Sequence, residues 1–429
     1  MKTVFLLAVA LLCPATLAQT PHPVPAFPGA EGFGAGATGG RGGTVVHVTN
    51  LDDGGEGSFR EAVSRPGRMV VFDVGGVIKI KSKVAVSSDI TIAGQSAPGE
   101  GITIYGEGVS FSGSKNIIVR YIRFRQGIAG SRGGKSINVT QASDLIFDHV
   151  SALWGRWDSL GFTEGAQRIT LQNSIIGQAI DPQRFGALLD GVREVTLARN
   201  LWINNQSRHP KLKGDIQYIN NVIYNWGVSG TIGGHSAAVW HQDIVGNLWI
   251  KGPSSTDKAL DTFASTDTVF QRNNVVDLTP DGQLTPRPIE QSDFLGETPP
   301  TFTQTAFLQP PFPVTITSPE SAFVVVSQFA GNSLHRDAIE TALINELRSL
   351  GTEGKIIRSE AESGGQPEIT PVSRPADFDS DRDGIADDWE RQHNLNPNNA
   401  SDASQTARSG YTNLEKYLNS IDASFYQTF

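Results

Sequence analysis

A dense cluster of cationic side chains lies near the middle of the chain. Residues 207–213 read Ser-Arg-His-Pro-Lys-Leu-Lys, which brings Arg208, Lys211 and Lys213 close together along the backbone. Arginine and lysine side chains donate charge-assisted hydrogen bonds to phosphate and carboxylate groups. A strand-like run over 215–226 follows the cluster directly. The cluster therefore indicates either a phosphate-binding turn or a cleft for a polyanion.

Charged residues in the preceding segments favour the cleft. Carboxylates and basic side chains alternate there, namely Asp148, Arg156, Asp158, Asp181 and Arg184. This mixture is suited to a polyanionic sugar that is held by Lys and Arg and by a bridging Ca²⁺. An alternative is structural: Asp148 and His149 would cap turns, and the lysines would form a solvated face.

A second group of carboxylates lies near the C-terminus, at 379–390. Carboxylates occupy positions 1, 3, 5, 9 and 12 of this twelve-residue stretch, glycine occupies position 6, and a carbonyl is offered at position 7. This is the spacing of an EF-hand loop, whose hard oxygen ligands select Ca²⁺. The expected ligands are Asp379, Asp381, Asp383, Ile385 through its carbonyl, Asp387 and Glu390. The alternative for 379–390 is a solvated acidic turn. Segment 402–418 resembles a second loop that lacks the early acidic ligands, so we expect one calcium ion in the tail.

A repeat of short β-branched runs must position the central residues. Taking the polar residue before each next apolar run as a register mark gives a spacing of 21 to 28 residues, at Gly94, Tyr121, His149, Asn173, Asn200, Asn221, Asn247 and Asn274. One coil per repeat, without long helices, predicts an all-β solenoid. Stacked asparagine amides favour a parallel β-helix over a β-sandwich, and chance enrichment of Asn in turns is the alternative.

The chain divides into four predicted parts. Residues 1–18 form a secretory signal peptide, 27–280 the β-helix, 281–365 covering loops with a helix at 336–350, and 366–429 the EF-hand-like tail. The apolar core of the signal is too short to span a bilayer, and no later stretch is long enough. We therefore expect a secreted, extracellular monomer that is not bound to a membrane.

Composition agrees with export. The one cysteine, Cys13, lies in the signal, so the mature domain must be stable without disulfides. A formal net charge of −9 argues against nucleic acid as a partner. Sequons permit glycosylation in a eukaryotic cell, at Asn138, Asn205 and Asn399. The alternative is that sequons arise by chance, and the position of Asn205 beside the cationic cluster argues against its use.

Several linked motifs resemble one enzyme family. The segments are 27–34 (FPGAEGFG), 90–95 (ITIAGQ), 148–155 (DHVSALWG), 207–211 (SRHPK) and 220–227 (NNVIYNWG). Together they are similar to the secreted pectate lyases of polysaccharide lyase family 1, and the tail is similar to calcium-binding tails on some members. The resemblance implies a right-handed parallel β-helix that cleaves pectate (de-esterified polygalacturonate) by Ca²⁺-assisted β-elimination.

The resemblance also implies residue roles. Arg208 occupies the place of the family's base, and Lys211 and Lys213 those of side chains that bind substrate carboxylates; Arg184 and Lys135 are further candidates. Neighbouring cations, including His209, would favour the neutral form of the base.

The chain differs from the family where the groove calcium is bound. Residues 133–137 (GGKSI) replace paired aspartates, Arg156-Trp157-Asp158 replaces an acidic pair, and 180–186 (IDPQRFG) replaces a segment with histidine and lysine. Lys135 or Arg156 would then stand in for the ion, or Asp158 and Asp181 would hold it once substrate bridges it. Two alternatives remain: a lyase for methylated pectin or another uronate polymer, and a non-catalytic polysaccharide-binding protein.

Overall fold

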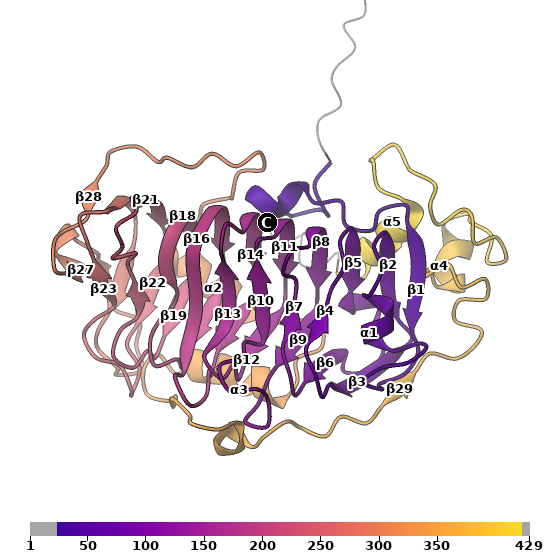
Figure 1. Cartoon of the computed structure of the whole chain (residues 1–429), viewed down its shortest axis with the longest axis horizontal. Coiled ribbons are helices and arrows are strands. Elements are labelled where there is room, and N and C mark those ends of the chain that lie inside the picture. The colour runs from indigo at the N-terminus through magenta and orange to yellow at the C-terminus, as the bar shows by residue number, and fades with distance from the viewer. Residues whose placement is uncertain (1–23, 423–429) are drawn as a thin grey trace, which may run out of the picture.

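The computed structural model describes residues 24–422, so the predicted signal peptide at 1–18 lies outside the described residues. The described chain is a parallel β-solenoid of about nine turns (Figure 1). Its core is a column of Val, Ile, Leu and Phe side chains that runs through the coils. The described residues contain no helix that is long and apolar enough to cross a membrane.

Three stacks of parallel strands form the faces of the solenoid. Face 1 contains β4 (Val84–Ala85), β7 (Val109–Ser110), β10 (Ile137–Thr140), β13 (Asp158–Thr163), the first halves of β16 (Phe185–Ala198) and β18 (Lys211–Ile219), β20 (Thr231–Ile232), β23 (Leu260–Phe263) and β27 (Phe294–Gly296). Face 2 contains β3 (Val74–Lys79), β6 (Ile102–Tyr105), β9 (Ile122–Arg125), β12 (Ser151–Leu153), β15 (Ile175–Gly177), β17 (Leu201–Ile203), β19 (Val222–Tyr224), β22 (Leu248–Ile250) and β25 (Val275–Asp277).

Face 3 contains β1 (Thr44–Val48), β2 (Arg68–Phe72), β5 (Ile90–Ala93), β8 (Lys115–Arg120), β11 (Ser143–Asp148), β14 (Gln167–Gln172), the second halves of β16 and β18, β21 (Trp240–Val245), β24 (Asp267–Arg272) and β28 (Thr301–Phe302). Two short antiparallel strands, β26 (Arg287–Pro288) and β29 (Val372–Ser373), close the ends of face 2. Since β27 and β28 continue the stacks, the coils extend beyond the limit of 280 expected from the sequence, into the proline-rich segment.

The asparagine ladder is present, but its register differs from the one read off the sequence. The side-chain oxygen of Asn221 accepts from the backbone N–H of Asn200 at 3.0 Å, and Asn247 and Asn274 repeat the contact. Asn173 lies one place earlier in its coil, in a left-handed turn with φ 51°, and Ser174 takes the ladder position. Because Asn173 and Ser174 are both polar, the sequence pattern alone does not distinguish the two registers.

Asn221 tests the ladder. Its buried amide also donates to Leu197 and Ile219, so truncation leaves several backbone groups unpaired. We expect Asn221→Ala to lower the free energy of unfolding by about 2 kcal/mol, measured by urea denaturation. The exposed Asn398→Ala is the control. Equal stability of the two variants would contradict a structural role for the ladder.

Two helices cover face 2. α2 (Pro319–Phe329) and α3 (Ala338–Arg348) bury Val326, Leu343 and Leu347 against side chains of the face 2 strands. Asp337 caps α3 by accepting from the backbone N–H of Glu340 at 3.1 Å. The predicted helix at 336–350 is therefore confirmed as a flank cover, whereas α2 was not anticipated. A short α1 (Phe59–Ala62) lies in the first coil.

The C-terminal segment returns to the N-terminal coils. Figure 1 shows α4 (Asp387–Gln392) and α5 (Asn413–Ser420) beside β1 and β2, at the opposite end from β27 and β28. Leu414 and Ile385 pack against Met69 of face 3. The buried Arg120 pairs with both Asp148, at 2.9 Å, and Asp422. This segment is therefore joined to the solenoid by apolar and ionic contacts.

Candidate functional site

The cationic cluster lies where the chain enters face 1 at β18, with Arg208 in the preceding loop and Lys211 and Lys213 on the first residues of the strand. Arg208 precedes β18 and has a left-handed backbone with φ 63°, a strained state for a residue with a Cβ. His209 holds this turn, because its carbonyl accepts from Tyr218 Oη at 2.9 Å and Thr231 Oγ1 at 2.6 Å. The backbone therefore fixes the Arg208 side chain above face 1.

His209 is not one of the cations that the sequence suggested. It is fully buried, and its Nε2 accepts from the backbone N–H of Asn205 at 3.2 Å. Burial lowers the pKa of His209 to about 3, so the imidazole is neutral at ordinary pH. Its role is to position the turn, and Lys211 and Lys213 are the neighbouring charges.

Arg208 extends to a buried carboxylate. Its Nη1 donates to Asp158 Oδ1 at 2.8 Å, and its guanidinium lies 4.1 Å from the ring centroid of Phe185. Burial raises the pKa of Asp158, and the positive charges of Arg208 and Lys135 oppose that rise. Asp158 Oδ2 has no hydrogen-bond partner among the described residues. The ring and the carboxylate together fix the plane of the guanidinium, and sequence analysis had not identified the contribution of Phe185.

The two lysines that follow have different surroundings. Lys213 pairs with Asp190 at 2.8 Å. No described carboxylate lies within 4.0 Å of Lys211, whose pKa is lowered to about 8 by burial and by the charges of Arg208 and Lys213. Lys211 is therefore the one of the two that is available to an incoming anion.

The other predicted groove residues line the neighbouring coils. The aliphatic part of Lys135 crosses Gly161, where a Cβ would lie 2.6 Å from its Cδ. Arg184 pairs with Asp181 at 3.3 Å. Arg156 donates to the carbonyls of Asp181 and Gly130, which makes it a brace between loops. Lys135 lies close enough to Asp158 for its charge to act on that carboxylate, whereas the guanidinium of Arg156 is engaged with backbone carbonyls.

The groove offers few ligands for the calcium ion predicted at Asp158 and Asp181. Each of these carboxylates pairs with an arginine, Arg208 and Arg184 respectively. Within residues 24–422, clusters of three acidic or histidine ligands occur in the C-terminal segment alone. Calcium takes six to eight oxygen ligands. These side chains by themselves therefore do not fit a calcium ion.

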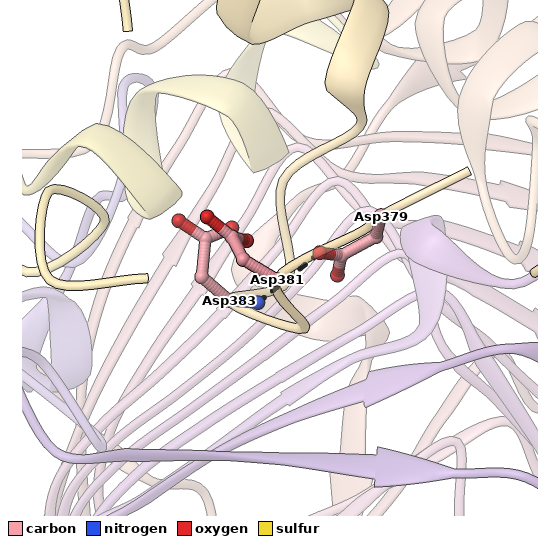
Figure 2. A group of neighbouring side chains, drawn as sticks. All are labelled: Asp379, Asp381 and Asp383. Atoms are coloured by element: carbon pink, nitrogen blue, oxygen red, sulfur yellow. Dashed lines mark hydrogen bonds between the residues drawn. The ribbon is translucent and has the colours of Figure 1, made fainter. Parts of the chain in front are cut away.

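The acidic cluster near the C-terminus has the opposite character. Ligand atoms of Asp379, Asp381 and Asp383 lie within 4.8 Å of one another (Figure 2), and a second group joins Asp383 to Glu390 and Asp402. Both carboxylate oxygens of Asp381 and of Glu390 lack a hydrogen-bond partner among the described residues. Unpaired buried carboxylates are costly without a cation. The cluster therefore fits a hard metal ion.

The cluster differs from the expected ligand set at two residues, because Asp387 is absent from it and Asp402 is present. The carboxylate oxygens of Asp387 accept from Ser380, at 2.8 Å, and from Arg391, at 3.0 Å, so they are already occupied. Asp402, from the segment interpreted as a degenerate second loop, contributes a buried oxygen without a partner. Burial, reinforced by neighbouring carboxylates, raises the pKa of Asp383 to about 7 and that of Glu390 to about 8.

The three sequons differ in accessibility. Asn205 is fully buried, and its side chain bonds to the backbone of Ile176 and Ala179. A glycan cannot be attached there without breaking the coil. Asn138 and Asn399 are both partly exposed.

The chain is similar to known proteins over nearly its whole length. No family model matches it. It is 43% identical over 415 residues to "Probable pectate lyase C" of Aspergillus fumigatus, covering 96% of this chain and 97% of that protein, and 41% identical over 423 residues to the protein of that name from Aspergillus terreus, covering 98% and 99%. These proteins are polysaccharide lyases. The chain belongs to the pectate lyases of polysaccharide lyase family 1.

Solved structures support the fold. A thermostable pectate lyase, PL 47, has a TM-score of 0.53 and 14% identity, covering 72% of this chain and 98% of that one. A mutant of the Bacillus subtilis pectate lyase has the same TM-score and identity, covering 74% and 99%. The solenoid predicted from the repeat is therefore confirmed.

Proposed function

We propose that this protein is a secreted enzyme that cleaves de-esterified (1→4)-α-D-galacturonan by β-elimination, with Arg208 as the base. The observation that carries the proposal is the Arg208 turn, which holds a guanidinium between Asp158 and Phe185 beside the available Lys211. The homologues named pectate lyase support the substrate class.

The reaction has clear requirements. The base takes the C5 proton of a uronate, the electron pair forms the C4=C5 double bond, and the C4 glycosidic oxygen departs and is protonated. Positive charge on the uronate carboxylate stabilises the enolate that develops. Arg208 is positioned as the base and takes the proton in its neutral form, while Lys211 and Lys135 supply charge that favours this form and stabilises the enolate. Lys213 and Arg184, which are already paired, would contact substrate by exchanging their partners.

Product analysis tests the proposal. Purified protein incubated with polygalacturonate should yield oligosaccharides that absorb at the ultraviolet band of an unsaturated uronate. Binding of the polymer without that product would instead favour a polysaccharide-binding protein.

A second candidate is a lyase for methylated pectin or another uronate polymer. The observation that favours it is that Asp158 and Asp181 pair with arginines, so that cationic side chains would take the place of a calcium ion in the groove. Rates on pectate and on methyl-esterified pectin, each with and without chelator, separate the two candidates. Faster cleavage of the ester would favour the second.

The acidic cluster completes the proposal. Asp379, Asp381, Asp383, Glu390 and Asp402 would hold Ca²⁺ in an EF-hand-like tail, with the Ile385 carbonyl as a further ligand. This ion would supply structural stabilisation. We also propose export through residues 1–18 and glycosylation at Asn138 and Asn399.

Lys211 gives a pH dependence. Its pKa of about 8 means that it is charged below pH 8 and neutral above it, while galacturonate remains ionised throughout. We therefore expect KM for polygalacturonate to rise several-fold, on the order of the ~1 kcal/mol of a partly exposed ion pair, as pH increases through about 8. Lys211→Arg should move this transition to higher pH. An unchanged KM profile in that variant would contradict a binding role for Lys211.

A further inference from the structure

A second cationic site lies on the same face, several coils toward the N-terminus. It is a pocket lined by Lys81, Lys83, Glu107, Gln126, Arg132 and Lys135. Lys81 and Lys83 come from the loop before β4, and Arg132 and Lys135 come from the loop before β10. These loops occupy the same edge of face 1 as the Arg208 loop before β18.

The charge of this pocket is unbalanced. Among the described residues, none of its four cationic side chains lies within 4.0 Å of a carboxylate. The carboxylate of Glu107 already accepts from the backbone N–H and the hydroxyl of Ser131, at 3.0 and 2.9 Å. Lys81, Lys83 and Arg132 outnumber Glu107, the one carboxylate that lines the pocket, and Asp53 and Asp158 partly offset the charges of Lys81 and Lys135. The remaining like charges repel one another unless an anion is bound. The pocket therefore favours an anionic ligand.

Both loops are fixed by contacts behind the pocket. Arg60 of α1 donates to the carbonyls of Ser82 and Lys83, each at 2.9 Å. The buried Gln126 donates to the carbonyl of Ser131 at 3.0 Å, and Arg156 donates to that of Gly130 at 2.9 Å. The cations thus project from held backbone, which reduces the entropy lost when a ligand binds.

The spacing matches a polymer and exceeds the reach of a small ligand. Five strand steps separate β4 from β18 on face 1, through β7, β10, β13 and β16. At roughly 4.8 Å per step, Lys81 and Lys83 lie about 24 Å from the Arg208 loop. Lys135 lies between these two lysines and the Arg208 loop. A uronate chain carries one carboxylate per sugar, so a chain laid along this edge presents charge at both places.

We propose that the pocket is a distal subsite that binds carboxylates of a uronate polymer several sugar units away from the bond broken at Arg208. This inference rests on the proposed function for the identity of the polymer. The distal contact raises affinity for long chains and adds nothing for chains too short to span the two places.

The double variant Lys81→Ala/Lys83→Ala tests the subsite. We expect the ratio of KM for polygalacturonate to KM for trigalacturonate to increase roughly three- to tenfold, as expected for the loss of two partly solvated ion pairs. Added salt should reduce the difference between variant and wild type, because it screens exposed charges.

A matched control removes two lysines elsewhere. Lys79→Ala/Lys355→Ala makes the same change in net charge, and both side chains are 64% exposed and pair with glutamates, at 3.7 and 2.5 Å. An equal change of the KM ratio in this control, or an unchanged ratio in the pocket variant, would overturn the subsite.

Binding measurements separate the two proposals. If the wild type forms no unsaturated product, the proposed function fails, but calorimetric titration with polygalacturonate still tests the pocket. Weaker binding by the pocket variant alone supports the subsite, and equal affinities of the variant and wild type overturn it.

Discussion

Replacing Arg208 by alanine is expected to lower kcat on polygalacturonate by about a thousandfold, within the range for loss of a positioned acid–base group. The Arg208 side chain is 19% exposed, and its guanidinium lies 2.8 Å from Asp158 and beside Lys211. Formation of the unsaturated product, followed by its ultraviolet absorbance, is the measurement.

Removing the arginine also leaves Asp158 buried without its partner. The pKa of Asp158 would then rise further, because burial already raises it and the opposing charge of Arg208 is gone. Arg208→Lys is the second variant, since it retains a cation near Asp158 while losing the planar group that lies on Phe185. We expect a loss of activity there too, with less effect on thermal stability.

Arg193→Ala controls for a change in charge. Arg193 is exposed on β16, outside the cluster around Arg208. Wild-type rates in this variant, together with inactive Arg208 variants that remain folded by circular dichroism, support the assigned base. Cleavage at the wild-type rate by Arg208→Ala would refute it.

The fold could be predicted from the sequence because a solenoid is a local repeat. The β-branched runs before Asn200, Asn221 and Asn247 each form one strand of successive coils, and each coil contacts chiefly its neighbours. The helix that carries Leu343 and Leu347 on one face could also be predicted, because its apolar residues recur at helical spacing. The error in the ladder at Asn173 arose because two adjacent polar residues satisfy the same pattern.

The site was predicted less completely, because electrostatic roles depend on burial. His209 resembles a cation in the sequence, but its enclosure in the turn makes it neutral. The sequence does not reveal that Asp158 and Asp181, which it predicts as calcium ligands once substrate bridges the ion, each pair with an arginine. Asp402 belongs to a segment distant from the loop of Asp379, and nothing in the local spacing indicates that chain folding brings the two together.

Removal of calcium is expected to lower the melting temperature of the whole protein. If the C-terminal cluster binds the ion, saturation at a thousand times Kd stabilises the native state by about 4 kcal/mol. The segment contacts the first coils through Leu414 and Met69 and through the Arg120–Asp422 pair. Loss of the ion should therefore destabilise the solenoid as well as the C-terminal segment. Differential scanning calorimetry with and without EDTA measures the change in melting temperature.

Two variants locate this ion at the cluster. Glu390→Gln removes a buried charge with two unpaired oxygens, so it should abolish the calcium-dependent increase in melting temperature and calcium binding by calorimetric titration. Asp387→Asn is the matched control, because its carboxylate lies in the same loop but bonds to Ser380 and Arg391. It should retain the calcium-dependent increase even if its baseline stability falls. If Asp387→Asn also loses calcium binding, Asp387 is a ligand, as the loop spacing predicts, and if Glu390→Gln keeps calcium binding, the ion is not held at this cluster.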